Sequence, residues 1–248
     1  MRRSVLFSIC LLVAAVCVGL GGWQLGRRAG RRTANRAALA ERALPALVSG
    51  DSDRVELRAN RRARISGRLD EGREFLLRGR VVQGIPAIQV VTPLRRPGSD
   101  TAVLINRGYV PAPDALEPGR ATWSEAGTPW FTGVLLAIPD RGDGAPLEHA
   151  GRETWRRLDL SAFRARLPYP IAPVYLVAEP DSAAGTAHTV RGQIYPFRAE
   201  PPPLSEGPHL MYAVQWFGIA AAVIAFGILF VLRDGPRTAP TSLPPEAP

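Results

Sequence analysis

Two long apolar stretches without charged residues, one near each end of the chain, limit what this sequence can fold into. Residues 4–26 read SVLFSICLLVAAVCVGLGGWQLG and are bounded by arginine pairs, while residues 207–232 end at Arg233. As a helix, either stretch rises about 1.5 Å per residue and can cross a hydrocarbon core about 30 Å thick. We therefore expect two transmembrane helices with one domain between them.

A cleaved signal peptide is the alternative interpretation of the first stretch, because Arg2 and Arg3 supply a positive n-region. The apolar run is too long for the h-region of such a peptide. The residues before Cys17, Ala-Ala-Val, also form a poor lipoprotein cleavage box. An uncleaved helix is the better interpretation.

The expected organisation has five parts along the chain. Residues 1–3 form a cytoplasmic N-terminus and residues 4–26 the first transmembrane helix. Residues 27–207 form a periplasmic, mainly β domain with short helices, and residues 208–232 the second transmembrane helix. Residues 233–248, rich in proline, are expected to be a disordered cytoplasmic tail. The alanine-rich segment 33–44 is predicted to be helical and to continue the first span as a single rod.

The domain between the spans has the period-two alternation of β-strands, with Gly and Pro between short runs. One helix is predicted over residues 160–167, with Asp159 or Ser161 as its cap. The fold class is therefore an α+β membrane protein, with two transmembrane helices enclosing a mainly antiparallel sheet that is barrel-like or curled. The predicted strands are 54–69, 73–83, 86–94, 102–110, 129–138, 154–160 and 171–179.

Composition and motifs exclude several classes of function. All 31 basic residues are arginine and the net charge is +9, yet the arginines alternate with acids and no nucleic-acid-binding motif is present. Anionic membrane lipid explains the charge more simply. Both cysteines, Cys10 and Cys17, lie in the first apolar stretch, so the domain has no thiol nucleophile. No nucleotide-binding, hydrolase or zinc motif occurs, and DRGDG at 140–144 fits a turn better than a calcium loop, so we expect no enzyme.

The ends of the two spans carry the residues that point to a cofactor. On a helix that begins at His209, steps of 100° place Tyr212 and Trp216 on the side of the histidine, with Ala213 and Ala220. A flat macrocycle could lie on this face with His209 as the axial ligand of its iron. The alternative is an interfacial aromatic belt of Trp23, Tyr212 and Trp216.

A seam of small residues in the first span indicates how the two helices pack. The seam can face a groove of small residues in the second span, because small side chains let helices approach closely. Gln24 would then lie near the domain-side end of the first span, close to Trp23. We call the domain-side end of each span its mouth. The seam consists of Cys10, Ala14, Cys17, Gly21 and Gln24, and the groove of Ala213, Ala220 and Gly227.

The two mouths, GGWQLGRR and HLMYAVQWFGIA, resemble the surfeit-locus-one family of cytochrome c oxidase assembly factors. That family has Gly-x-Trp-Gln-x-x-Arg at the first mouth and His-x-x-Tyr-Ala-x-x-Trp-Phe at the second. NRGYVP at 106–111 and GIPAIQVVTPL at 84–94 resemble two internal pieces of the family. One departure is Gly207-Pro208, where the family usually has Asn-Asn.

The resemblance implies a function that composition alone does not give. It implies an assembly factor with a periplasmic domain, whereas flanking charges leave the orientation open. Because no amphipathic, Arg-rich transit peptide precedes the first span, we expect a bacterial plasma membrane rather than a mitochondrial one. It implies help in inserting haem a into oxidase subunit I, or in protecting that subunit, with haem a synthase as a candidate donor. A haem-independent scaffold for the nascent subunit is the alternative. The expected cofactor-binding residues are His209, as ligand to the haem iron, with Tyr212, Trp216, Trp23 and Gln24.

Overall fold

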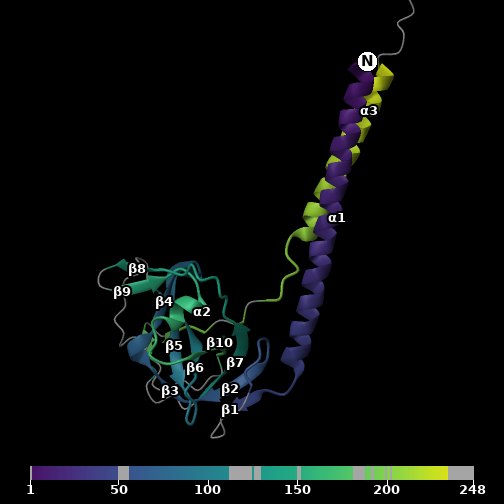
Figure 1. Cartoon of the computed structure of the whole chain (residues 1–248). Helices are drawn as coiled ribbons and strands as arrows, with labels where there is room; N and C mark the ends of the chain where they lie inside the picture. The colour runs from purple at the N-terminus through teal and green to yellow at the C-terminus, as the bar shows by residue number, and fades with distance from the viewer. Residues whose placement is uncertain are drawn as a thin grey trace, which may run out of the picture. The chain divides into compact units, whose positions relative to one another are not determined.

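The computed structural model divides the chain into two compact units, which are described separately. The helix unit comprises Met1–Arg36 and Leu204–Pro248, and the sheet unit comprises Ala37–Pro203 (Figure 1). The structure describes residues 2–49, 56–111, 125, 130–149, 152–180, 188–190, 193–198, 200–201 and 203–233. The predicted disordered tail beyond Arg233 lies outside these residues.

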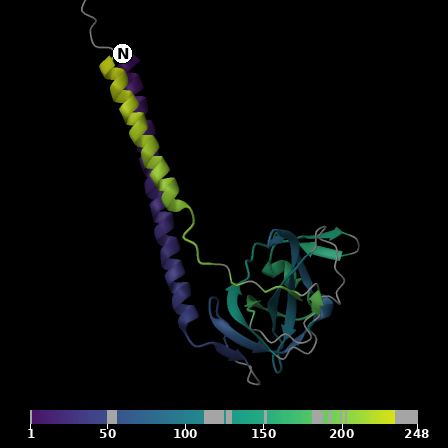
Figure 2. The same cartoon turned by 180° about the vertical axis from the view of Figure 1, so that it is seen from behind.

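Two helices, both long and apolar enough to cross a membrane, form the helix unit. Helix α1 (Arg2–Ala43) continues without a break past its apolar stretch, which confirms the predicted rod. Helix α3 (His209–Arg233) runs antiparallel beside the first part of α1, as Figures 1 and 2 show from opposite sides. The described residues of the chain therefore place an apolar helix at each end.

Small residues allow α1 and α3 to approach closely, as the predicted seam requires. A Cβ added at Gly21 would lie 2.6 Å from the ring of Phe217. One added at Gly227 would lie 3.1 Å from Cβ of Cys10. Between these points Trp216 packs against the cluster of Ala14, Cys17 and Ala220. Without side chains at the glycines, the two backbones come close enough for continuous packing.

The sheet unit contains one ten-stranded mixed sheet among the described residues, in the order β1-β2-β7-β10-β6-β5-β4-β9-β8, with β3 paired to β5. Most pairs are antiparallel, but β1 with β2, β10 with β6, and β4 with β9 are parallel. The sheet does not close on itself within the described residues, so the expected curled sheet is confirmed. Its strands are β1 (Leu47–Ser49), β2 (Arg62–Ser66), β3 (Arg68–Leu69), β4 (Phe75–Val82), β5 (Ile85–Arg95), β6 (Ala102–Pro111), β7 (Trp130–Ala137), β8 (Pro146–His149), β9 (Arg152–Trp155) and β10 (Ile171–Ala178).

Strand β6 lies at the centre of the sheet unit and is buried on both faces. Its side chains alternate, so Val103 and Ile105 join one hydrophobic core while Ala102 and Leu104 join another. Helix α2 (Leu160–Arg164) covers the second core with Leu160 and Phe163. The ring of Phe163 stacks on Phe75 with 3.8 Å between centroids.

Local signals in the sequence predict many of these elements correctly. Asp159 caps α2 by accepting a hydrogen bond from the amide of Ala162, which confirms one of the two predicted caps. The predicted strand 54–69 was wrong over residues 56–61, which form no strand. The predicted strand 154–160 ends earlier, at Trp155. The sequence analysis missed β1, β8 and the hairpin of β11 (His188–Val190) with β12 (Gln193–Tyr195).

Candidate functional site

His209, the first residue of α3, lies beside the side chain of Gln24 of α1. Its ring nitrogen Nδ1 is 2.8 Å from Gln24 Oε1, a hydrogen bond between residues far apart in the chain. Both residues are partly buried at the end of the paired helices. The structure therefore brings together the two polar residues that the sequence places at the domain-side ends of the two different spans.

The contact with Gln24 assigns different roles to the two ring nitrogens. An amide oxygen only accepts hydrogen bonds, so Nδ1 must donate its proton to Gln24. In the neutral tautomer with its proton on Nδ1, Nε2 has a free lone pair. Metal-ligating histidines commonly have this arrangement, in which a hydrogen bond at one nitrogen orients the ring for ligation through the other.

A glycine turn borders the free side of the His209 ring. Gly207 has φ of +75°, a conformation that residues with a Cβ rarely adopt. A Cβ at Gly207 would lie 3.4 Å from His209 Nε2 and 3.3 Å from Cδ2. The carbonyl of Pro208 accepts the amide of Tyr212 and begins the hydrogen bonding of α3. Gly207 therefore gives the turn its geometry and leaves space beside Nε2.

A polar ladder on one face of α1 holds the chain that leads into α3. Gln24 bonds His209, and Arg28 Nε lies 2.9 Å from Glu206 Oε2. Arg32 Nε lies 3.1 Å from the other oxygen of Glu206, and Asn35 donates to the carbonyl of Leu204. Steps of three or four residues keep the α1 members of this ladder on one side of the helix. The sequence analysis missed the ladder, although the spacing of its α1 residues was a visible signal.

The aromatic residues expected near the histidine lie in different surroundings. Trp23 and Tyr212 are 58% and 47% exposed, whereas Trp216 is partly buried against α1. Ala213 and Ala220 are buried against α1, so the small-residue face of α3 is already covered. A flat group could not lie on those alanines in this arrangement.

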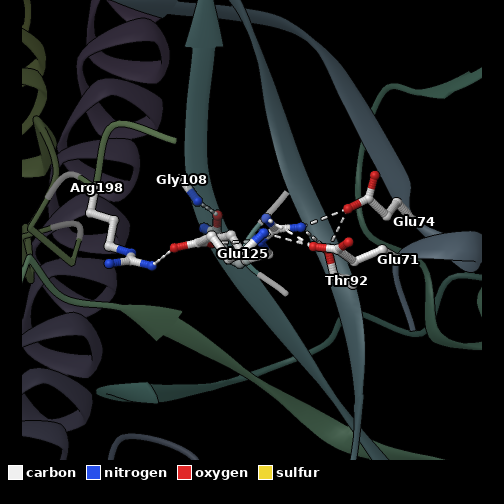
Figure 3. Close-up of polar contacts among 8 residues, drawn as sticks. Glu71, Glu74, Thr92, Gly108, Glu125 and Arg198 are labelled. Atoms are coloured by element: carbon white, nitrogen blue, oxygen red, sulfur yellow. Dashed lines mark hydrogen bonds and ion pairs between the residues drawn. The ribbon is translucent and has the colours of Figure 1, made fainter. Parts of the chain in front are cut away.

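A second polar cluster, which we call the Arg107 cluster, is enclosed in the sheet unit. It consists of Arg107, Thr92, Glu71, Glu74, Glu125 and Arg198. The Arg107 side chain is fully buried, and its Nε lies 2.7 Å from Glu125 Oε2. Its Nη1 lies 2.7 Å from Glu74 Oε1 and its Nη2 lies 3.6 Å from Glu71 Oε1. Figure 3 shows Glu125 between Arg198 and the carboxylates of Glu71 and Glu74.

The Arg107 cluster accounts for one of the internal pieces, NRGYVP, whose role the sequence left open. These residues form the second half of β6, which confirms the strand predicted over 102–110. Gly108 has φ of +123°, and a Cβ there would lie 2.4 Å from the carbonyl oxygen of Phe197. Tyr109 and Phe197 exchange both backbone hydrogen bonds, at 2.9 and 2.7 Å. Arg107 and Gly108 thus fasten the segment around Phe197 to the central strand.

The remaining candidate residues form no further site among those described. No group of three or more His, Cys, Asp and Glu there could hold a metal ion. Cys10 and Cys17 are free thiols buried in the helix seam. The other two histidines, His149 and His188, lie at strand ends, His149 at the end of β8 and His188 at the start of β11. The DRGDG segment forms a bend, where Asp140 accepts hydrogen bonds from Ser161.

Comparison with known proteins identifies the family. A family model described as the SURF1 family matches residues 11–221. The chain belongs to the SURF1 family. A SURF1-like protein of Monosiga brevicollis is 25% identical over 99% of this chain and 95% of its own length. Surfeit locus protein 1 of Homo sapiens is 26% identical over 94% of this chain and 80% of its own length. The protein of that name from Rattus norvegicus is 24% identical over 86% of this chain and 71% of its own length.

The family match confirms the resemblance of the two helix mouths and spans both polar sites. Gln24, Arg107 and His209 all fall within the matched residues. Membership of the SURF1 family implies a role in cytochrome oxidase assembly.

Proposed function

We propose that this protein assists cytochrome c oxidase assembly by holding haem a at the mouth of its helix pair before the haem enters subunit I. The hydrogen bond of 2.8 Å between His209 Nδ1 and Gln24 Oε1 carries the proposal. It orients the ring and leaves Nε2 as a nitrogen ligand beside the space at Gly207. No covalent reaction is required of the protein.

The residues at the mouth fit a haem in the chemistry of their donors. His209 Nε2 would ligate the iron, which supplies a Lewis-acidic centre when bound. Exposed Trp23 and Tyr212 offer apolar rings with polar edges at the same end of the helices. Trp216 would support the site from within the seam, where it packs against Ala14 and Ala220. Gln24 would act by orienting His209.

The polar ladder supports the proposal because it fixes the position of the histidine. Glu206, two arginines of α1 and the Asn35 contact hold the residues just before His209 against α1. A ligand whose surroundings are already ordered loses less entropy when it binds. The departure Gly207-Pro208 is compatible with ligation, since Pro is accepted at a helix start and Gly207 provides the required turn.

We further propose a bacterial plasma membrane as the location, with the sheet unit on the periplasmic side. Two helices long and apolar enough to cross a membrane support a two-span arrangement. In that arrangement both chain ends share one side and the helix mouth with His209 faces the side of the domain. Haem a synthase is the proposed donor and oxidase subunit I the proposed acceptor.

The test is an optical spectrum of the full chain, purified in detergent from cells that make haem a. We expect Soret and α bands in the parent protein and their loss in His209→Ala. Gln24→Leu removes the orienting hydrogen bond, so haem affinity should fall about 10–100-fold while some haem is retained. The matched controls are His149→Ala and His188→Ala, which should keep the spectrum of the parent.

Two results would contradict the haem proposal. Bands of equal intensity in the parent and His209→Ala would place the haem elsewhere. A folded parent without haem, whose His209→Ala variant still captures subunit I and restores oxidase yield, would favour the haem-independent scaffold. Capture of subunit I and oxidase yield should therefore be measured on the same variants.

A further inference from the structure

The arginines that follow the apolar stretch of α1 divide into two sets on different faces of the helix. Arg28 and Arg32 point to Glu206 and form the ion pairs of the polar ladder. Arg27 and Arg31 lie about 100° away around the helix axis and are exposed. Among the described residues, neither of them has a carboxylate partner. Glu206 therefore neutralises part of the charge of the first face, whereas the second face keeps both of its positive charges.

A shallow groove lies on the face of Arg27 and Arg31. It has a volume of about 610 Å³ and is lined by these two arginines with Trp23, Gly26 and Gly30. A Cβ added at either glycine would meet nothing within 4 Å, so the space beside the two glycines is unfilled. The guanidinium of Arg27 lies 6.0 Å from the centroid of the Trp23 ring, which is 58% exposed.

The position of this groove along α1 indicates which kind of molecule can bind in it. Residues 4–26 carry no charge, and Arg27 is the first charged residue after them. A helix that spans a bilayer over this stretch places Trp23 and the arginines at the level of the lipid headgroups. Arginine binds phosphate oxygens through paired N–H donors, and tryptophan is favoured at this interface.

We propose that Trp23, Gly26, Arg27, Gly30 and Arg31 form a binding site for the phosphate headgroup of an anionic phospholipid. The two arginines, one turn apart, bind the phosphate, and the glycines let the headgroup approach the helix backbone. Trp23 contacts the glycerol and the upper acyl chain. The two arginines of the site lie on a different face of α1 from the polar ladder, and Trp23 borders both this site and the proposed haem site. Binding of the phosphate by Arg27 and Arg31 does not require His209 or haem.

The test measures the apparent Kd of the full chain for phosphatidylglycerol in neutral detergent, with phosphatidylcholine as the reference lipid. Each arginine near an anionic surface contributes roughly a fivefold factor in affinity. Arg27→Gln with Arg31→Gln should therefore bind phosphatidylglycerol about 25-fold more weakly. The matched control, Arg28→Gln with Arg32→Gln, removes the same charge from the same turns and should lose much less.

A second variant separates a groove from simple charge attraction. Gly26→Leu with Gly30→Leu keeps all the arginines, raises helix propensity and fills the groove. This variant should lose the preference for phosphatidylglycerol while its helical circular dichroism stays intact. Equal losses in the two arginine double variants, or parental binding by the glycine variant, would overturn the site. Competition by inorganic phosphate at the lipid's own concentration would overturn the assignment to a lipid.

Discussion

His209 in the helix unit and Arg107 in the sheet unit are both held by hydrogen bonds, but the two residues differ in what remains unbonded. His209 donates from Nδ1 to Gln24, while Nε2 faces the turn at Gly207. Arg107 has a partner at each of its three nitrogens and no exposed surface. A residue with one coordinating atom left open can bind a ligand, whereas the nitrogens of Arg107 are all engaged by partners within the sheet unit.

The two regions also use glycine and small residues in different ways. In the helix pair, Gly21 and Gly227 remove side chains so that two helices can touch. In the sheet, Gly108 removes a side chain so that the carbonyl of Phe197 can lie against β6. The first arrangement joins two elements along their length, and the second fastens one segment at a point.

Arg107→Met should give the largest loss of stability, because it removes an ion-pair partner from the buried carboxylates of Glu74 and Glu125 and leaves Arg198 as the one remaining cation of the cluster. Removing one partner of a buried ion pair costs about 3–5 kcal/mol. The measurement is urea unfolding of the full chain in detergent, followed by tryptophan fluorescence. The control is Arg58→Met, since Arg58 pairs with Glu56 on the surface and such pairs contribute below about 1 kcal/mol.

The helical circular dichroism of Arg107→Met sharpens the comparison. If the Arg107 cluster stabilises only the sheet unit, the signal of the helix pair should persist where the sheet has unfolded. Unchanged urea stability in Arg107→Met, relative to Arg58→Met, would show that the cluster is not a stabilising feature.

Sequence reasoning located the helix mouth but not the Arg107 cluster, and the reason is the range of the interactions. Helical periodicity is local, so steps of 100° suffice to place Gln24 in the seam and His209 at the start of its helix. The cluster instead joins Arg107 to Glu74, 33 residues away, and Glu125 to Arg198, 73 residues away. Only the strand order of the folded sheet brings those residues together.

The same distinction applies to the sheet itself. Long buried strands such as β5 and β6 have runs of apolar and β-branched residues that indicate strands from the sequence. Short β1 has three residues, and its parallel pairing with β2 depends on the chain path between them. Glu206 was likewise missed as a partner of Arg28, because a Pro- and Gly-rich segment gives no periodic signal.

Gly21→Ala should weaken the packing of α1 against α3. The expected loss of stability is smaller than that of Arg107→Met. The added Cβ would lie 2.6 Å from the ring of Phe217, and overpacking of this kind typically costs about 1–3 kcal/mol, which the helix preference of alanine offsets by up to about 1 kcal/mol. Gly22→Ala is the matched control, because a Cβ there meets nothing within 4 Å and alanine favours the helix by up to about 1 kcal/mol. Thermal melts of the helical signal in detergent should show a lower Tm only for Gly21→Ala. Equal shifts in both variants would argue against close packing at this point of the seam.

Replacing Tyr169 should have the smallest predicted effect on stability, because its polar contact in the sheet unit is only partly buried. Its hydroxyl donates to Asp70 Oδ2 at 2.6 Å. Partial burial, and then the hydrogen bond and charge of Asp70, raise the pKa of Tyr169 above its ordinary value of 10.0. The folded protein thus holds this proton more tightly than the unfolded chain, so the contribution is complete below pH 10 and is lost as the pH rises through the folded pKa.

Tyr169→Phe should therefore lower stability at neutral pH by about 0.5–1.5 kcal/mol, the range of a typical single hydrogen bond. The difference from the parent should shrink when unfolding is measured at rising pH above 10. Tyr212→Phe, which alters an exposed tyrosine, controls for the general effect of removing a phenol. A difference that stays constant with pH would show that the contact with Asp70 does not hold the proton. A difference as large as that of Arg107→Met would remove the distinction between an enclosed polar cluster and a half-exposed contact.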